Sequence, residues 1–230
     1  MKFSLFFYYV LVTYTAIVTA GTVEEVTTQA CEEVKRNAKE IQNLFLEISK
    51  LKRSLYAIKE QIHEETEHTI NEVIENDKKT LEFINKIDQE NCRAKAEKEL
   101  KTAYNLTITD INIGCQKETI EKIDVLQIDL KETNESLSKV NKTNSEIIQF
   151  CFNTTNQEAE QLEQCFKAQD NEVKDEIQKC VGIVNIIKNQ VTDIEINVEI
   201  VIKCIQASSW IFNQMTDRII VDVKKCAGID

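Results

Sequence analysis

Apolar residues recur at spacings of three and four along most of this chain. From Val34 to Ile48 they fall on one face of a helix, and after an offset of one residue the pattern continues to Ile62. A helix with one apolar face needs a partner to cover it. The sequence therefore predicts a long amphipathic helix from Cys31 onwards, packed against other helices.

The helical pattern continues as far as Cys115, with weak interruptions. The apolar positions from Ile70 to Ile87 extend the first signal, with Asn76-Asp77 and Gln89-Glu-Asn91 as the expected interruptions. The segment between Cys92 and Cys115 predicts another helix, and Gly114 is expected to end it in the left-handed conformation.

A helix is also predicted from Ile120 towards the polar cluster at 141–144, with Phe150 and Cys151 returning the chain to the core. The following Asn153-Thr-Thr-Asn156 predicts a turn, because short polar side chains favour helix caps over helix interiors.

The stretch from Cys151 to Cys180 combines a heptad repeat with three cysteines. The heptad positions are Phe152, Ala159, Phe166, Val173 and Cys180. On one continuous helix Cys151, Cys165 and Cys180 share a side, yet residues 14 apart lie about 21 Å apart, which is beyond the reach of a disulfide. We therefore expect these cysteines to bond to other helices; the alternative is a turn between them.

The segment from Asp193 to Ile202 fits two templates. Its apolar residues alternate as in a β-strand, but they also belong to a series with helical spacing from Ile187 to Ile205. A lone strand cannot satisfy its backbone groups, so we predict a helix, with a small two-stranded element involving Tyr104 as the alternative. A last short helix is predicted from Trp210 to Cys226.

The chain contains no proline and only four glycines, which favours long uninterrupted helices. The predicted fold class is all-α, an elongated antiparallel helical bundle of coiled-coil character that disulfides cross-link. We expect one domain at 21–230, in which an N-terminal hairpin at 31–90 could pack on a cysteine-rich part at 91–230.

Residues 1–20 resemble a secretory signal peptide, with Lys2, an apolar run and small residues before Gly21. An uncleaved anchor is the alternative. Cleavage near Gly21 predicts a secreted, extracellular protein that does not span a membrane afterwards, since no later stretch is apolar enough to do so.

The cysteines and the glycosylation acceptors of the chain are also typical of a secreted protein. Four disulfides are expected, although about a hundred pairings of eight cysteines are formally allowed. These cysteines are Cys31, Cys92, Cys115, Cys151, Cys165, Cys180, Cys204 and Cys226. The predicted N-glycosylation acceptors, which should face solvent, are Asn105, Asn134, Asn141 and Asn153.

The formal net charge of −11 argues against nucleic acid as a partner, because phosphate binding needs clustered basic residues. His63 and His68 are five residues apart and point to different sides of a helix, so they do not form a zinc site. No nucleophile and base motif, phosphate loop or Cys-x-x-Cys pair is present. We therefore predict no enzyme activity, no metal and no cofactor.

Two functions remain. The first is an interaction or structural role towards extracellular proteins or surfaces. The alternative is a carrier of a small apolar ligand, held in a bundle cavity that the helix from Val181 to Ile205 would line.

The acidic helices, the widely spaced cysteines and the segment Phe152-Asn-Thr-Thr to Gln161-Leu-Glu-Gln-Cys165-Phe-Lys-Ala resemble the tsetse EP-type domain family of secreted insect proteins over about residues 90–226. That resemblance implies secretion from gut or related epithelia, a possible immune association and no catalytic activity. The chain lacks the family founder's Glu-Pro tail. Small insect haemolymph glycoproteins are the weaker resemblance, and neither family transfers functional residues to this sequence.

Overall fold

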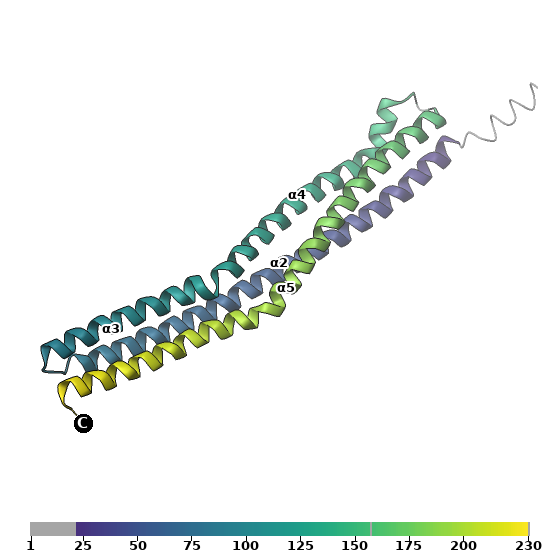
Figure 1. Cartoon of the computed structure of the whole chain (residues 1–230). Coiled ribbons are helices and arrows are strands. Elements are labelled where there is room, and N and C mark those ends of the chain that lie inside the picture. The colour runs from purple at the N-terminus through teal and green to yellow at the C-terminus, as the bar shows by residue number, and fades with distance from the viewer. Residues whose placement is uncertain (1–21, 157, 230) are drawn as a thin grey trace, which may run out of the picture. The chain divides into compact units, whose positions relative to one another are not determined.

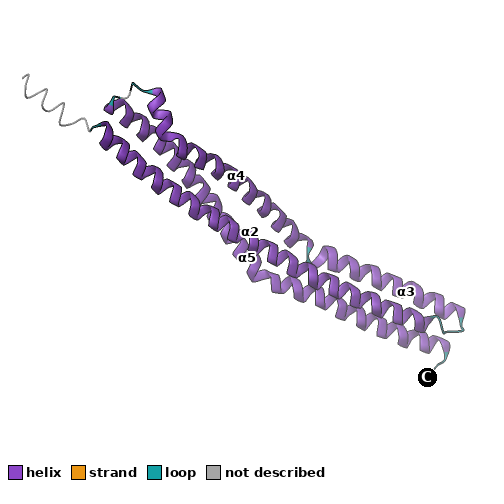
Figure 2. Cartoon of the chain, turned by 180° about the vertical axis from the view of Figure 1, so that it is seen from behind, coloured by secondary structure: helices purple, strands orange, loops and turns teal. Residues whose placement is uncertain are grey.

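The computed structural model describes residues 22–229 except residue 157. The expected signal peptide at 1–20 and the cleavage site near Gly21 lie outside the described residues. Within them the regular structure is entirely helical and contains no strand (Figure 2), which confirms the all-α class.

The described residues form four α-helices and one short π-helix. In chain order they are α2 (Val23–Ile84), α3 (Glu90–Thr109), the π-helix η1 (Asp110–Cys115), α4 (Lys117–Thr154) and α5 (Ala159–Ala227). Figure 1 labels the four α-helices.

Local sequence signals mark the start of α2 and the end of α5. At the start of α2 the Glu25 backbone N–H donates to Thr22 Oγ1 at 3.2 Å, and the Thr22 backbone N–H donates to Glu25 Oε2 at 2.9 Å. This is a capping box, which satisfies two backbone donors at once. After α5, Gly228 adopts a φ of 64°, a left-handed conformation that commonly terminates helices.

The chain forms two compact units, and each draws on three segments of helix. The first unit consists of the described residues up to Lys50 together with Asp129–Ile187. The second unit consists of Leu51–Ile128 and the described residues from Lys188 onwards. The division therefore runs through α2, α4 and α5 and does not follow the expected boundary at residue 90.

In the first unit α2 and α5 run in parallel. Lys174 contacts Glu33 across 141 residues of sequence, and Gln178 contacts Glu40 across 138, so the offset between the two helices changes little along their length. Segment α4 supplies the third layer, with buried residues at alternating spacings of three and four. These residues are Leu130, Thr133, Leu137, Val140, Asn144, Ile147 and Cys151.

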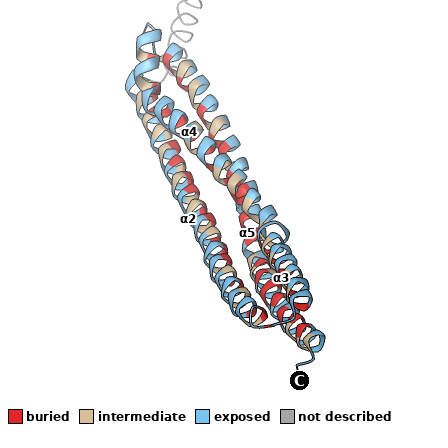
Figure 3. Ribbon diagram, turned by 90° about the vertical axis from the view of Figure 1, so that its left-hand side faces the viewer, coloured by how far each residue is buried: buried red, intermediate tan, exposed pale blue. Residues whose placement is uncertain are grey.

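The second unit repeats this arrangement. Ser54 and Glu65 of α2 meet Glu195 and Gln206 of α5, in each case across 141 residues, so these helices are again parallel. The separation between α2 and the middle segment instead falls, from 65 residues at Lys59–Asp124 to 50 at Thr66–Gln116, as expected for antiparallel helices. Buried positions face the interior of the bundle in Figure 3.

Some local predictions were wrong. Asn76-Asp77 does not interrupt α2, and Trp210 to Cys226 is part of α5 instead of a separate helix. Phe150 does not return to the core, because its side chain is 48% exposed. The segment from Asp193 to Ile202 is helical as predicted. The break between α4 and α5 follows Thr154, so it overlaps the turn predicted at 153–156 but begins two residues later.

Candidate functional site

Two disulfides join the middle helical segment of the second unit to α5. Cys92 of α3 bonds to Cys226, and Cys115 at the end of η1 bonds to Cys204. Each closes a long stretch of sequence, 134 and 89 residues respectively. They tie α3 and η1 to α5 at two levels, in accordance with the prediction that disulfides link different helices.

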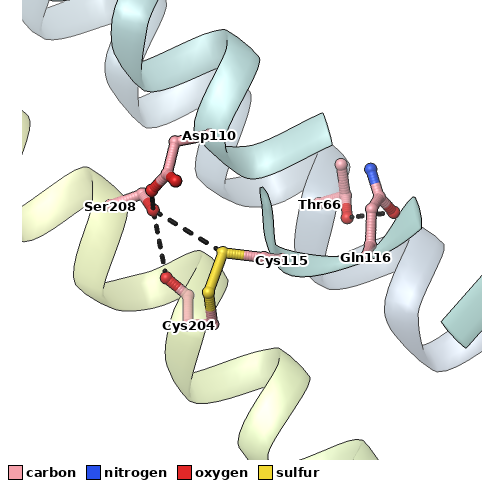
Figure 4. The surroundings of a disulfide bond; sticks show 6 residues. All are labelled: Thr66, Asp110, Cys115, Gln116, Cys204 and Ser208. Atoms are coloured by element: carbon pink, nitrogen blue, oxygen red, sulfur yellow. Dashed lines mark hydrogen bonds between the residues drawn. A yellow bond between two sulfur atoms is a disulfide. The ribbon is translucent and has the colours of Figure 1, made fainter. Parts of the chain in front are cut away.

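The second of these disulfides lies in a polar cluster, shown in Figure 4. The Ser208 hydroxyl donates to Asp110 Oδ2 at 2.6 Å and lies 3.1 Å from the carbonyl oxygen of Cys204. On the other side, Thr66 Oγ1 donates to Gln116 Oε1 at 3.1 Å. The break between α3 and α4 is thus held to both neighbouring helices.

Gly114 serves a different purpose from the predicted one. Gly228 is the described glycine with positive φ, so Gly114 does not end a helix in the left-handed conformation. A Cβ atom on Gly114 would lie 2.6 Å from Asp110 Oδ1, closer than side-chain carbons approach an oxygen. Glycine at this position leaves room for the carboxylate that accepts from Ser208.

The prediction that Cys151 and Cys165 bond outward to other helices was wrong. They are bonded to each other, with their Cα atoms 5.8 Å apart. The expectation assumed one continuous helix, whereas α4 ends at Thr154 and α5 begins at Ala159. The alternative, a turn between the two cysteines, is what the structure contains.

The expected fourth disulfide is not formed, because Cys31 and Cys180 carry free thiols. The offset of 141 residues at Lys174–Glu33 places Cys31 level with a residue eight positions before Cys180 on α5. Eight helical residues span roughly 12 Å, which a disulfide cannot bridge. Cys180 is buried, and this burial raises the pKa of its thiol.

A buried polar layer joins all three helices of the first unit. Asn37 Nδ2 donates to Asp170 Oδ1 at 2.8 Å and to Asn144 Oδ1 at 3.3 Å. Asn144 Nδ2 donates to the carbonyl oxygen of Val34 at 2.9 Å, and Lys174 Nζ donates to Asp170 Oδ2 at 2.5 Å. Sequence reasoning missed this layer, although Asn144 occupies the helical register of the buried positions on either side of it.

The same layer perturbs one titrating group. The hydrogen bonds that Lys174 makes to Asp170, and then to Glu33, raise the pKa of its ammonium group. In coiled coils a polar residue at a core position specifies how the helices align. The layer around Asn37 can specify the helix alignment in this way, because its buried polar atoms are paired. Every buried side-chain nitrogen and oxygen in the described residues has a hydrogen-bond partner.

All four predicted glycosylation acceptors lie on the middle helices. Asn105 is on α3, whereas Asn134, Asn141 and Asn153 are on α4. Asn134 is half-buried and the other three are exposed. The outer surfaces of α2 and α5 carry no acceptor sequence.

The two histidines are not brought together with metal ligands. His68 Nδ1 lies 3.8 Å from Glu72 Oε1 on the same helix, and both side chains are exposed. Among the described residues no group of three or more His, Cys, Asp or Glu side chains is placed to hold a metal ion.

The carrier hypothesis predicts that the segment from Val181 to Ile205 lines an interior cavity. In the structure the inward side chains of this segment are packed in the core. Val184, Ile187, Val191 and Ile205 are each at most 2% exposed. The open surface depressions of about 480 and 500 Å³ in the second unit are instead lined by residues of α3, η1 and the later part of α5.

None of the helices in the described part of the chain is long and apolar enough to cross a bilayer. Neither a family model, nor a curated protein, nor a solved structure matches this chain. The resemblance to the tsetse EP-type domain family thus stays a prediction.

Proposed function

We propose that this chain is a secreted, N-glycosylated extracellular protein of insect type that acts by contact with other proteins and not by catalysis. The tsetse EP-type resemblance suggests gut or immune-associated secretion. Three disulfides support an oxidising extracellular environment. The interaction role rests on one observation, an apolar stripe on the outer face of α5.

The α5 stripe consists of Ile196, Ile200, Trp210 and Val221, all in the second unit. Their exposed fractions are 68%, 64%, 63% and 61%. At about 100° per residue they fall within roughly 80° of one another, opposite the core residues of the same helix. The alignment of these exposed apolar side chains along one outer face supports its use in contact with other proteins.

The glycosylation acceptors support this use of α5. Glycans on α3 and α4 would shield the middle helices and leave the α5 stripe uncovered, because α5 has no acceptor sequence. Aromatic residues such as Trp210 are also enriched in the energetically dominant parts of interfaces.

Secretion and contact are tested separately. The full chain is expressed in insect cells, and we expect a disulfide-bonded protein in the medium whose mass falls on treatment with a peptide N-glycosidase. Retention inside the cell with all thiols reduced would contradict the proposal.

The contact surface is tested by comparing the proteins that wild-type and I196D/W210D capture from the insect's secreted fluids. Partners that use the α5 stripe should be lost with the double variant. Leu46→Asp is the matched control, since Leu46 is 55% exposed on α2 in the first unit. If both variants capture the same proteins as wild-type, the stripe is not the interaction surface.

A further inference from the structure

A groove in the second unit runs between α3–η1 and α5. It comprises two open surface depressions of about 500 and 480 Å³, which share Leu106 and Met215 and are therefore adjacent. Buried Ala103 and Ile219 line the first depression, and buried Thr107 and Ser208 line the second. These volumes fall within the usual range for small-molecule sites.

Apolar side chains that are unusually exposed form the walls of this groove. Leu106 is 59% exposed, Ile113 60%, Ile211 43% and Met215 37%. Ile113 belongs to η1, and π-helical turns are frequent at functional sites. An apolar ligand chain lying on these side chains would remove them from water, which is the main source of affinity for such ligands.

The two ends of the groove differ in charge. Lys95, Lys98 and Arg218 line one end together with Glu99. Lys95 and Arg218 have partners on their own helices, at 3.9 Å each, but such exposed ion pairs are weak and leave the cations available. Asp110 lines the opposite end. A local excess of positive charge is notable in a chain with a net charge of −11.

We propose that this groove binds a long-chain carboxylate, that is, a free fatty acid. The carboxylate lies at the end formed by Lys95, Lys98 and Arg218, and the hydrocarbon chain extends over Leu106 and Met215 towards η1. Asp110 repels an anion at the far end and so fixes the orientation.

The dimensions agree with this ligand. Ser208 and Arg218 of α5 are ten positions apart, which is about 15 Å at the helical rise, a length suited to an extended hydrocarbon chain. This site uses different residues from the α5 stripe, so it goes beyond the proposed interaction role and does not depend on it.

The test uses full-length, delipidated protein and isothermal titration with dodecanoate below its micelle concentration. We expect saturable binding of one dodecanoate per chain that weakens as salt is added. Dodecanol should bind more weakly, and dodecyltrimethylammonium more weakly still, because the cationic end of the groove repels it.

Variants locate the site. K98Q/R218Q should reduce dodecanoate affinity roughly fivefold, as expected for exposed charge contacts, and leave dodecanol binding unchanged. Leu106→Asp should reduce binding of both by about tenfold or more. K117Q and I128D are the matched controls in the same unit, since both residues are exposed and neither lines the groove; each should bind dodecanoate within about twofold of wild-type. Circular dichroism confirms that each variant is folded.

Four results would overturn the proposal. The first is the absence of saturable dodecanoate binding, and the second is an equal effect of the groove and control variants. The third is binding to lipid vesicles without binding to monomeric dodecanoate, which would assign the groove to a membrane surface. The fourth is a dimer seen by light scattering that Leu106→Asp abolishes while dodecanoate does not bind, which would assign the groove to a second copy of the chain.

Discussion

Cys151 and Cys165 are bonded across the turn that joins α4 to α5, with their Cα atoms 5.8 Å apart. Cys151 is the last buried residue of α4, and Phe152 packs edge-on against Phe166, with ring centroids 6.3 Å apart. The bond therefore fixes the two helices where the chain reverses, and it closes a loop in which the partners are separated by only 14 residues.

Loss of this bond should destabilise the first unit moderately. For C151S/C165S we expect a decrease of about 3 kcal/mol in the free energy of unfolding, from the loop-closure entropy regained by the unfolded chain. For C92S/C226S the same argument predicts about 5 kcal/mol, because the closed loop is much longer. Urea denaturation measures both. Equal stability of C151S/C165S and wild-type would show that the turn is held by packing alone.

The two free thiols should differ in reactivity. Cys31 is half-buried, whereas Cys180 is buried and its thiol pKa is raised by that burial, so less of the reactive thiolate forms. We expect iodoacetamide to modify Cys31 in the folded protein and Cys180 only after unfolding, as peptide mass spectrometry would show.

The thiol count also tests the disulfide pattern. Unfolded but unreduced wild-type should contain two titratable thiols per chain, and C31S should contain one. A count of zero for wild-type would mean that Cys31 and Cys180 are oxidised as well.

The helical class and the α4–α5 turn could be predicted from the sequence because both are local signals, apolar spacing and a run of short polar residues. To predict the Cys151–Cys165 bond, both signals had to be combined. The apparent heptad from Phe152 to Cys180 instead suggested one continuous helix without the turn. The role of Gly114 could not be predicted, because it depends on where Asp110 and Ser208 meet in space. The groove depends likewise on residues of α3 and α5 that are more than a hundred positions apart.

The buried layer around Asn37 should matter for stability. Asn37→Leu removes the donor to Asp170 and Asn144 and leaves both acceptors short of a partner, so we expect a loss of roughly 1–3 kcal/mol. N37L/N144L should cost less than the sum of the two single changes, because the residues share a hydrogen bond. The control Asn197→Leu, at an exposed site, should change stability by less than about 0.5 kcal/mol. Additive single and double changes in thermal or urea unfolding would argue against a coupled layer.

Asp77 gives the protein a specific pH dependence. Burial raises the pKa of the Asp77 carboxyl above its ordinary value of 3.8. The folded state then binds this proton more tightly than the unfolded state, so the ionised carboxylate destabilises the fold at neutral pH. This destabilisation disappears as the pH falls through the folded-state pKa towards the ordinary value.

Asp77→Asn should accordingly raise the melting temperature at pH 7, and its advantage over wild-type should vanish near pH 3. Asp217→Asn provides the comparison at an exposed position in the same unit. Differential scanning calorimetry across this range measures the difference. A stabilisation by Asp77→Asn that is the same at both pH values would attribute it to something other than the carboxyl charge.

Gly114 and Asp110 should be energetically coupled. In a helical backbone without positive φ, replacing glycine by alanine normally stabilises by roughly 0.5–1 kcal/mol. At Gly114 the added Cβ would lie 2.6 Å from Asp110 Oδ1, so the carboxylate must move and its hydrogen bond from Ser208 is weakened. Gly114→Ala should therefore bring no gain in wild-type but the full gain in the Asp110→Ala background. Gly182→Ala is the matched control, because nothing lies within 4 Å of its added Cβ, and it should stabilise both backgrounds equally. Urea unfolding of these variants gives the coupling free energy, and a value of zero would show that Gly114 is not kept for the Asp110 carboxylate.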